Sequence, residues 1–210
     1  MSLQRTGYTK KTPQHYWVDA GAIYDNLTFN KETKTWEGGK PIGATADGNK
    51  ITFEQEYRQI EVDGVFVPAV GQKVLKSASA KLEVNVKEVT PENIRKSING
   101  IIRKDKDYEG YSIIESKSQL DDSDYIPHLY LVGTITGSKK PIIVEFDNCL
   151  CISGLNVETK DDDEAVIKME FEAHASAEQV ADRKIPARFY APDTGEEISI
   201  EKLTKEKKEE

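Results

Sequence analysis

Residues 41–90 constrain the fold more than any other part of the chain. Apolar and polar side chains alternate along residues 51–54 and again along residues 81–87. A period of two places one set of side chains in a core and the other set on an exposed face. Residues 63–71 lie between the two runs and hold two glycines and a proline, which favour turns. The pattern predicts a long β-excursion with an outgoing strand, a tip and a returning strand.

The tip of this excursion, residues 60–74, is rich in valine and carries few charges. An exposed apolar tip on a chain of net charge −8 indicates a protein partner. The alternative is a tip that folds back onto its own core. Together with two aromatic residues near the N-terminus, the candidate subunit-contact residues are Ile60, Val62, Val65, Phe66, Val67, Val70, Val74, Tyr16 and Trp17.

The charge balance is acidic, with 37 Asp and Glu against 29 Lys and Arg. A protein that binds nucleic acid tightly needs clustered cations to replace the counterions of the phosphates. The composition therefore argues against a nucleic-acid-binding protein. No run of about 18 apolar residues is present, and residues 1–12 lack an apolar segment, so we expect neither a membrane helix nor a signal peptide.

One helix start is clear, at Thr90-Pro91-Glu92. Threonine caps a helix, proline suits its first position, and an acidic side chain favours the positive end of the helix dipole. We expect a short helix, the only substantial one, that ends near Gly100. Its apolar residues at helical spacing are predicted to pack on a sheet, and they are Ile94, Ile98, Ile101 and Ile102.

The remaining elements are predicted strands, which makes the fold class mainly β. Their number and spacing predict an antiparallel β-sandwich or open barrel with one flanking α-helix. Residues 30–39 are predicted to form a turn, and a short strand is expected at 111–116. The other expected strands are a first one within 18–29, a hairpin of 128–136 and 141–146, a second hairpin of 148–157 and 165–173, and a last strand at 187–191.

The length of 210 residues fits one domain. We divide the chain into an N-terminal arm at 1–17, a β-domain at 18–195 that includes the excursion at 41–90, and a charged tail at 196–210. The arm has no periodic pattern and is expected to gain order on a partner. The tail is expected to be solvated.

No catalytic, cofactor-binding or metal-binding residues are predicted, and we expect no enzyme activity. The histidines His15, His128 and His174 are scattered, and a zinc set of His174 with the two cysteines lacks a fourth ligand. Cys149 and Cys151 lie two apart on a predicted strand, where a disulfide is geometrically awkward. Buried free thiols in a reducing cytoplasm are the simpler interpretation.

An ordered series of short runs resembles the major tail tube proteins of tailed bacteriophages. The resemblance extends from about residue 19 to residue 194, and none of the runs contains chemistry. The runs are Gly-Ala-Thr at 43–45, Ile-Thr-Phe at 51–53, residues 58–64, 81–85, 124–126, 132–137 and 140–144, residues 148–154, and Phe-Glu-Ala-His at 171–174.

This resemblance implies the fold of tail tube proteins, which the tube protein of type VI secretion systems shares. It also implies a subunit that self-assembles into stacked rings of six and forms the conduit for DNA ejection in a phage, prophage or phage-derived particle. The implied partners are other copies of the chain, a tape measure protein, an initiator and, in a contractile tail, a sheath. DNA would pass through the lumen without specific binding. The implied location is the virion tail, assembled in the host cytoplasm, with no membrane contact.

Acidic residues on exposed strand faces are candidates for the lumen of such a tube, because carboxylates repel phosphates. These candidates are Glu83, Glu170 and Glu172, and nearby lysines at 81, 87 and 168 dilute the negative charge. The alternative is an ordinary solvated face.

A function from another class is a monomeric β-sandwich binding module, for example for carbohydrate. Trp36, Tyr108 and Tyr111 would then form an aromatic platform. Sedimentation separates the two functions, since a binding module stays small at high concentration whereas a tube protein forms rings or filaments.

Overall fold

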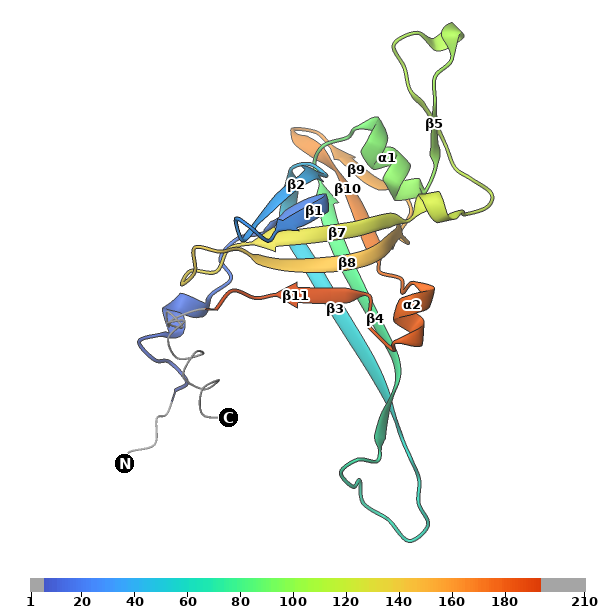
Figure 1. Ribbon diagram of the computed structural model, residues 1–210. Coiled ribbons are helices and arrows are strands. Elements are labelled where there is room, and N and C mark those ends of the chain that lie inside the picture. The colour runs from blue at the N-terminus through green and yellow to red at the C-terminus, as the bar shows by residue number, and fades with distance from the viewer. Residues whose placement is uncertain (1–5, 194–210) are drawn as a thin grey trace.

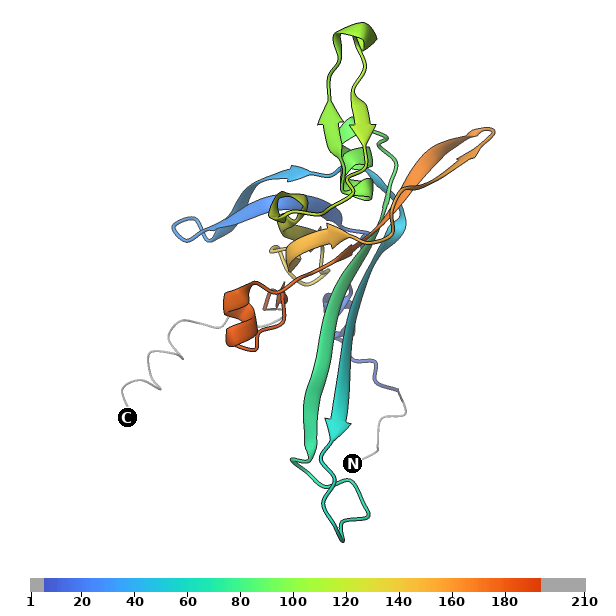
Figure 2. The same ribbon diagram turned by 90° about the vertical axis from the view of Figure 1, so that its right-hand side faces the viewer.

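The computed structural model describes residues 6–193, apart from the side chains of residues 160 and 163 (Figures 1 and 2). The predicted tail at 196–210 and the first five residues of the predicted arm lie outside the described residues. The helices of this part are α1 (Pro91–Ile98) and α2 (Ala177–Ala181), with 3-10 turns η1 (Thr12–His15), η2 (Lys106–Tyr108) and η3 (Asp122–Asp124). The strands are β1 (Ala22–Asn30), β2 (Thr35–Pro41), β3 (Thr45–Gln59), β4 (Lys73–Val86), β5 (Ile101–Arg103), β6 (Ile113–Glu115), β7 (Ile126–Gly133), β8 (Ile142–Cys151), β9 (Asn156–Lys160), β10 (Asp163–Glu172) and β11 (Ala187–Tyr190).

Nine of these strands form one antiparallel sheet that folds into two layers. Layer one holds β2, β1, β7, β8 and β11 in that order. Layer two holds β9, β10, β4 and β3. The layers join where the end of β8 pairs with the end of β10, at Cys151 opposite Phe171. In Figure 1 the long strands of layer two cross behind those of layer one. The predicted mainly antiparallel β-fold is confirmed.

The core lies between the two layers and takes alternate side chains from their inner faces. The alternation predicted along residues 81–87 is confirmed, since every second residue is buried, and the burial along residues 167–173 alternates in the same way. Full burial of a Val, Leu, Ile, Met or Phe side chain stabilises the fold by roughly 1.5–3 kcal/mol. The core includes Ile23, Leu82, Val84, Val86, Leu129, Leu131, Val144, Phe146, Ile167, Met169 and Phe171.

Strands β3 and β4 form the predicted excursion. Only its near part rests on the core, because the side chains of β3 are exposed on both faces from Phe53 onward. The pairing shifts register between Glu56 and Tyr57, which marks a β-bulge and increases the local twist. Figures 1 and 2 both show this ribbon projecting far beyond the body of the molecule.

Helix α1 begins where the sequence predicts. Oγ1 of Thr90 accepts a hydrogen bond from the backbone N–H of Asn93 at 3.2 Å. The helix ends at Asn99, which adopts the left-handed conformation with φ of 49°. Gly100 follows directly, close to the predicted end.

The packing face of α1 agrees with the prediction at Ile94, which packs against the core, and differs from it beyond the helix. Ile101 and Ile102 lie beyond the helix, in β5, and are 44% and 37% exposed. The buried residues within α1 are polar. Their burial is possible because hydrogen-bond partners face them. Asn93 Nδ2 donates to the carbonyl oxygens of Ile42 and Glu88, at 3.0 and 2.9 Å.

Two strand predictions need correction. Residues 30–39, predicted as a turn, hold a turn followed by the start of β2. Gly38 and Gly39 lie within β2 and adopt positive φ of 75° and 76°. Two adjacent glycines are typical of a loop, so the composition does not predict a strand there. The strands predicted at 141–146 and 148–157 are divided at a different place, because β8 runs without a break from Ile142 to Cys151 and β9 begins at Asn156. The short strand expected within 111–116 is confirmed as β6, which pairs with β5 in a separate two-stranded sheet.

The two cysteines are free and buried in the core, as predicted. Burial, followed by the nearby charge of Asp147, raises the pKa of the Cys149 thiol. In the described part of the chain, neither helix has the length and apolar character needed to cross a membrane.

Candidate functional site

The tip of the β3–β4 ribbon, residues 60–74, is closed by backbone hydrogen bonds and open to solvent. The N–H of Ile60 donates to the carbonyl of Gln72 at 2.8 Å, which closes the base of the loop. Phe66 is 95% exposed and Val70 is fully exposed. The tip does not fold back onto its own core, so the apolar surface predicted from the sequence is accessible. The other predicted contact residues of the tip are 40–57% exposed, and they are Ile60, Val62, Val65, Val67 and Val74.

The described part of the N-terminal arm lies against the turn between β7 and β8. Trp17 forms an isolated bridge with Ile135, and the carbonyl of Tyr16 accepts from the N–H of Thr136 at 3.0 Å. A Cβ at Gly133 would clash with the indole of Trp17, so the close approach depends on glycine. Residues 12–17 therefore have structure on the chain's own domain, which the sequence did not predict. Tyr16 and Trp17 remain partly exposed beside this turn.

The outer face of layer two carries the predicted lumen residues. Glu83 on β4 and Glu170 on β10 are cross-strand partners, and Glu172 lies two residues further along β10. Lys50 forms an ion pair with Glu83, and Lys81 Nζ lies 3.0 Å from Glu170 Oε1. The hydrogen bond to Glu170 and its charge raise the pKa of Lys81. The three carboxylates thus share one face with paired lysines, and their role in a lumen stays a prediction.

Two buried carboxylates lie on the outer face of layer one, both on β8. The side chains of Glu145 and Asp147 are 6% and 3% exposed. Arg188 on β11 binds both, with Nε 3.2 Å from Glu145 Oε2 and Nη2 3.0 Å from Asp147 Oδ2. Buried carboxylates are stable when they are paired and hydrogen-bonded. Further donors complete the network, namely the hydroxyls of Tyr130 and Tyr190 to Glu145 and the amide of Gln179 to Asp147.

His128 adds a third possible metal ligand to this network. Its Nδ1 lies 3.0 Å from Asp147 Oδ1 and 3.4 Å from Glu145 Oε1. An imidazole with two carboxylates suits a divalent transition metal. The guanidinium of Arg188 already pairs with both carboxylates, however, and a bound dication would have to compete with that charge. We assign the cluster a structural role, which is to hold β11 against β8.

No local sequence pattern predicts this cluster, because its members are far apart along the chain. His128 and Asp147 become neighbours only through the pairing of β7 with β8. Arg188 arrives from a third strand, opposite Glu145. The alternation of polar residues at 145 and 147 within an apolar run was the one available signal.

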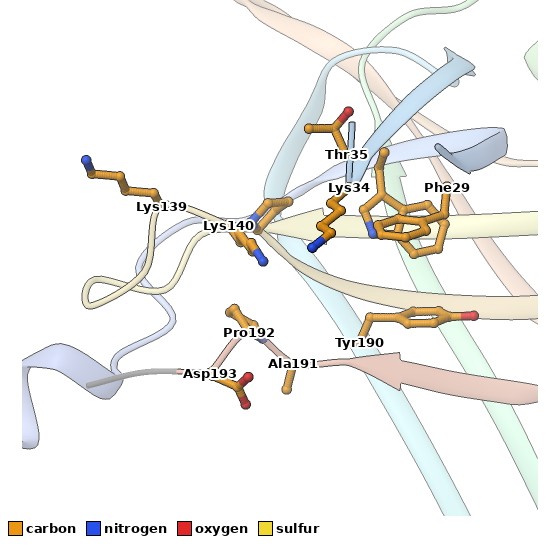
Figure 3. Close-up of a pocket in the computed structure, with 11 residues that line it drawn as sticks. Phe29, Lys34, Thr35, Lys139, Lys140, Tyr190, Ala191, Pro192 and Asp193 are labelled. Atoms are coloured by element: carbon orange, nitrogen blue, oxygen red, sulfur yellow. The ribbon is translucent and has the colours of Figure 1, made fainter. Parts of the chain in front are cut away.

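A hollow of about 690 Å³ lies next to this network (Figure 3). Its apolar wall is built on Trp36, whose ring centroid lies 5.4 Å from that of Phe29 and 4.8 Å from that of Tyr190. Figure 3 shows Lys34 and Lys140 reaching toward the hollow. The combination of aromatic rings and ammonium groups suits an anionic group on an apolar body.

The aromatic platform of Trp36, Tyr108 and Tyr111 is not formed. Trp36 packs among the aromatic residues of layer one, whereas Tyr108 and Tyr111 line a separate hollow at the end of the β5–β6 hairpin. The prediction grouped residues that belong to different parts of the fold.

No protein-family model matches the chain, and no curated protein matches it. Among solved structures, the tail of an empty gene transfer agent particle with C6 symmetry aligns over 82% of this chain and 96% of that chain, with 13% sequence identity and a TM-score of 0.42. The virion of a native gene transfer agent particle aligns over 81% of this chain and 96% of that chain, with 12% identity and a TM-score of 0.39.

Proposed function

We propose that the chain is the structural, non-enzymatic subunit of a phage-like tail tube. It self-assembles into stacked rings that form the conduit for DNA ejection. The observation that carries this proposal is the β3–β4 ribbon, which combines a long free strand edge with an exposed apolar tip. A free edge is a template for pairing with another chain, and an exposed apolar patch marks an interaction site.

Strand addition at the edges of layer two accounts for ring formation. β3 pairs with β4 on one side, and no strand of the described chain lies on its other side. β9 is the edge at the opposite end of the layer. When β3 of one copy continues the sheet beside β9 of the next, the contact is heterologous, and a ring results when the rotation closes. The sequence resemblance implies six subunits in that ring.

Contacts through the ribbon tip account for the stacking of rings. The tip residues at 60–74 reach beyond the body of the subunit, so they are available to a copy in the adjacent ring. Tyr16 and Trp17 are the candidates for the same interface from the arm. Burial of Phe66 and its aliphatic neighbours would supply the apolar contribution, at about 25 cal/mol per Å² removed from water.

The outer face of layer two lines the lumen in this arrangement, with Glu83, Glu170 and Glu172 facing passing DNA. Carboxylates repel the phosphates, and ion pairs with Glu83 and Glu170 occupy Lys50 and Lys81. Lysines held in this way are less available to replace the counterions of DNA. DNA would therefore pass without specific binding. The further partners would be a tape measure protein, an initiator and, in a contractile tail, a sheath, in a virion tail assembled in the host cytoplasm.

Negative-stain electron microscopy of the concentrated protein, paired with sedimentation, tests the function. We expect rings or hollow tubes from the natural chain. The double variant Phe66→Ser/Val70→Ser should keep the fold, because both side chains are exposed, and should lose the tubes. Val180→Ser is the matched control, since Val180 is 64% exposed on α2, away from the ribbon. Tubes from the double variant at the natural concentration would contradict the stacking role of the tip.

The second candidate function is a monomeric binding module, which the aromatic hollow beside Trp36 favours. Such a protein would remain monomeric at every concentration and would bind a ligand in a glycan screen. Loss of that binding in Trp36→Ala, with no change in sedimentation, would support this function over the tube.

A further inference from the structure

Two ribbons project from opposite ends of the subunit. In Figures 1 and 2 the β3–β4 ribbon points one way and the β5–β6 hairpin points the other. We propose that the ribbon tip of one copy binds the β5–β6 hairpin of a second copy in the adjacent ring. This inference rests on the tube function proposed above and names the surface that receives the tip.

The β5–β6 hairpin has the features of an uncovered interaction surface. It is a separate two-stranded sheet, tied across its strands by the Arg103 Nη2 to Glu115 Oε1 hydrogen bond at 2.9 Å. Two-stranded hairpins are marginally stable in water on their own. Ile101 and Ile102 at its base are more than a third exposed. A docked second copy would cover this ribbon and stabilise it.

The end of the hairpin matches the tip in chemistry. It borders an open hollow of about 520 Å³, where Tyr108 and Tyr111 are 59% and 74% exposed. The tip presents Phe66 and Val70, which are almost fully exposed. Aromatic and aliphatic side chains of this kind form the buried anchors of protein interfaces.

The hairpin end offers cations to the acidic residues of the tip, although its own charge is mixed. Exposed Glu61 and Asp63 flank the apolar part of the tip, and exposed Lys104 and Lys106 border the hollow of the hairpin beside Asp105 and Glu109. Opposite charges at the rim of an interface steer association and fix its register.

The other hairpin on that side of the molecule suits the tip less well. The turn between β9 and β10 projects toward the same end as β5–β6 in both views. It carries exposed carboxylates at Asp161 and Asp162, with Glu158 nearby on β9, and these would face the acidic residues of the tip. Like charges across an interface are unfavourable. The β5–β6 hairpin is therefore the acceptor that the chemistry selects.

The contact has the symmetry that a tube needs. Donor and acceptor lie at opposite ends of one chain, so each copy uses its tip toward one neighbour and its hairpin toward the other. A heterologous contact that does not close on itself produces an open filament.

A cross-linking experiment on the assembled full-length protein tests the proposal. The double variant Ala69→Cys/Ser112→Cys places one thiol in the tip and one beside the hairpin hollow, with small changes in side-chain volume. Treatment of its tubes with a short bismaleimide should give a ladder of covalent multimers on a denaturing gel. Each single variant should give no ladder, because the natural cysteines are buried. The matched control is Ala69→Cys/Asp161→Cys, with its second thiol in the β9–β10 turn, and it should give none either.

The outcomes separate this inference from the function on which it rests. Tubes without a ladder from the Ala69/Ser112 pair, or with a ladder from the control pair, would overturn the hairpin as acceptor and leave the tube function standing. Failure of the natural chain to form any ring or tube would overturn both. As a second measurement, Tyr108→Ser/Tyr111→Ser should raise the concentration needed for tubes at least tenfold while single rings still form. Tube formation at the natural concentration would count against the hairpin.

Discussion

Arg188 donates from Nη2 to both carboxylate oxygens of Asp147, at 3.1 and 3.0 Å. This pair joins β11, near the end of the described chain, to the central strand β8. The side chain of Asp147 is almost fully buried, and its negative charge is stabilised by the guanidinium of Arg188, which is half exposed. Breaking such a pair from one side leaves an uncompensated buried charge.

Replacement of Arg188 should therefore destabilise the fold. We expect Arg188→Ala to lower the free energy of unfolding by about 3 kcal/mol, measured by urea denaturation. Arg188→Lys keeps the charge but loses the hydrogen bond shared by the two oxygens of Asp147. Its free energy of unfolding should therefore lie between those of the natural chain and Arg188→Ala. Adding Asp147→Asn to Arg188→Ala should restore part of the loss. An Arg188→Ala variant as stable as the natural chain would show that the network does not anchor β11.

The hydroxyl of Tyr190 should make stability fall at alkaline pH. Burial, followed by the hydrogen bond to Glu145, raises the pKa of Tyr190 to about 12, compared with about 10 in an unfolded chain. Because the folded pKa is raised, this contribution to stability is complete below pH of about 10 and is lost as the pH rises through about 12. Unfolding free energies of the natural chain and Tyr190→Phe should therefore converge across this window. A difference that stays constant from neutral to alkaline pH would contradict the assignment.

The cap of α1 should make a measurable contribution to stability. Thr90→Ala removes the hydrogen bond to the N–H of Asn93, and we expect a loss of about 1 kcal/mol in the free energy of unfolding. Thr90→Ser retains a hydroxyl that can cap and serves as the control. Equal losses in the two variants would mean that packing of the threonine methyl group matters more than the cap.

The two cysteines should resist thiol reagents in the folded protein. Both are buried, and the raised pKa of Cys149 keeps its thiol protonated at neutral pH. An aromatic disulfide reagent should release its coloured thiolate slowly in buffer and report two thiols at once in denaturant. Rapid labelling without denaturant would indicate that the β8 region opens locally.

Removal of the carboxylates that pair with the lysines of layer two should make the tube bind DNA. Glu83→Gln/Glu170→Gln releases Lys50 and Lys81 from their ion pairs, so tubes of this variant should retain DNA at low salt and release it as salt rises. Co-sedimentation with linear DNA measures the retention. Glu32→Gln/Glu178→Gln, in the β1–β2 turn and in α2, changes the net charge by the same amount outside layer two and serves as the control. Equal retention by the control would mean that layer two does not face the DNA.

Local patterns in the sequence predicted the elements that local physics determines. The alternation along 81–87 gave the buried face of β4, and Thr90 with Pro91 located the start of α1. The apolar tip at 60–74 was also recognisable, because turn residues separate it from the two strands. Each of these signals lies within a few residues of the structure that it predicts.

The features that sequence reasoning missed depend on distant partners. β2 was not predicted because two adjacent glycines, Gly38 and Gly39, are typical of loops. Only pairing with β1 makes them part of a strand. Ile101 and Ile102 continue the helical spacing of α1, but Asn99 ends the helix before them. The cluster of His128, Asp147 and Arg188 needs three strands to come together, which no local pattern encodes.

The long β3–β4 ladder has a mechanical consequence. The two strands pair from Asn49 to Gln59 with their hydrogen bonds perpendicular to the ribbon axis. A pull on the tip along that axis draws both strands in the same direction, so the two covalent backbones carry it as tension, and the force neither unzips the ladder nor slides one strand past the other. A subunit that holds its neighbour by this ribbon is thus built to withstand tension along the direction in which the ribbon projects.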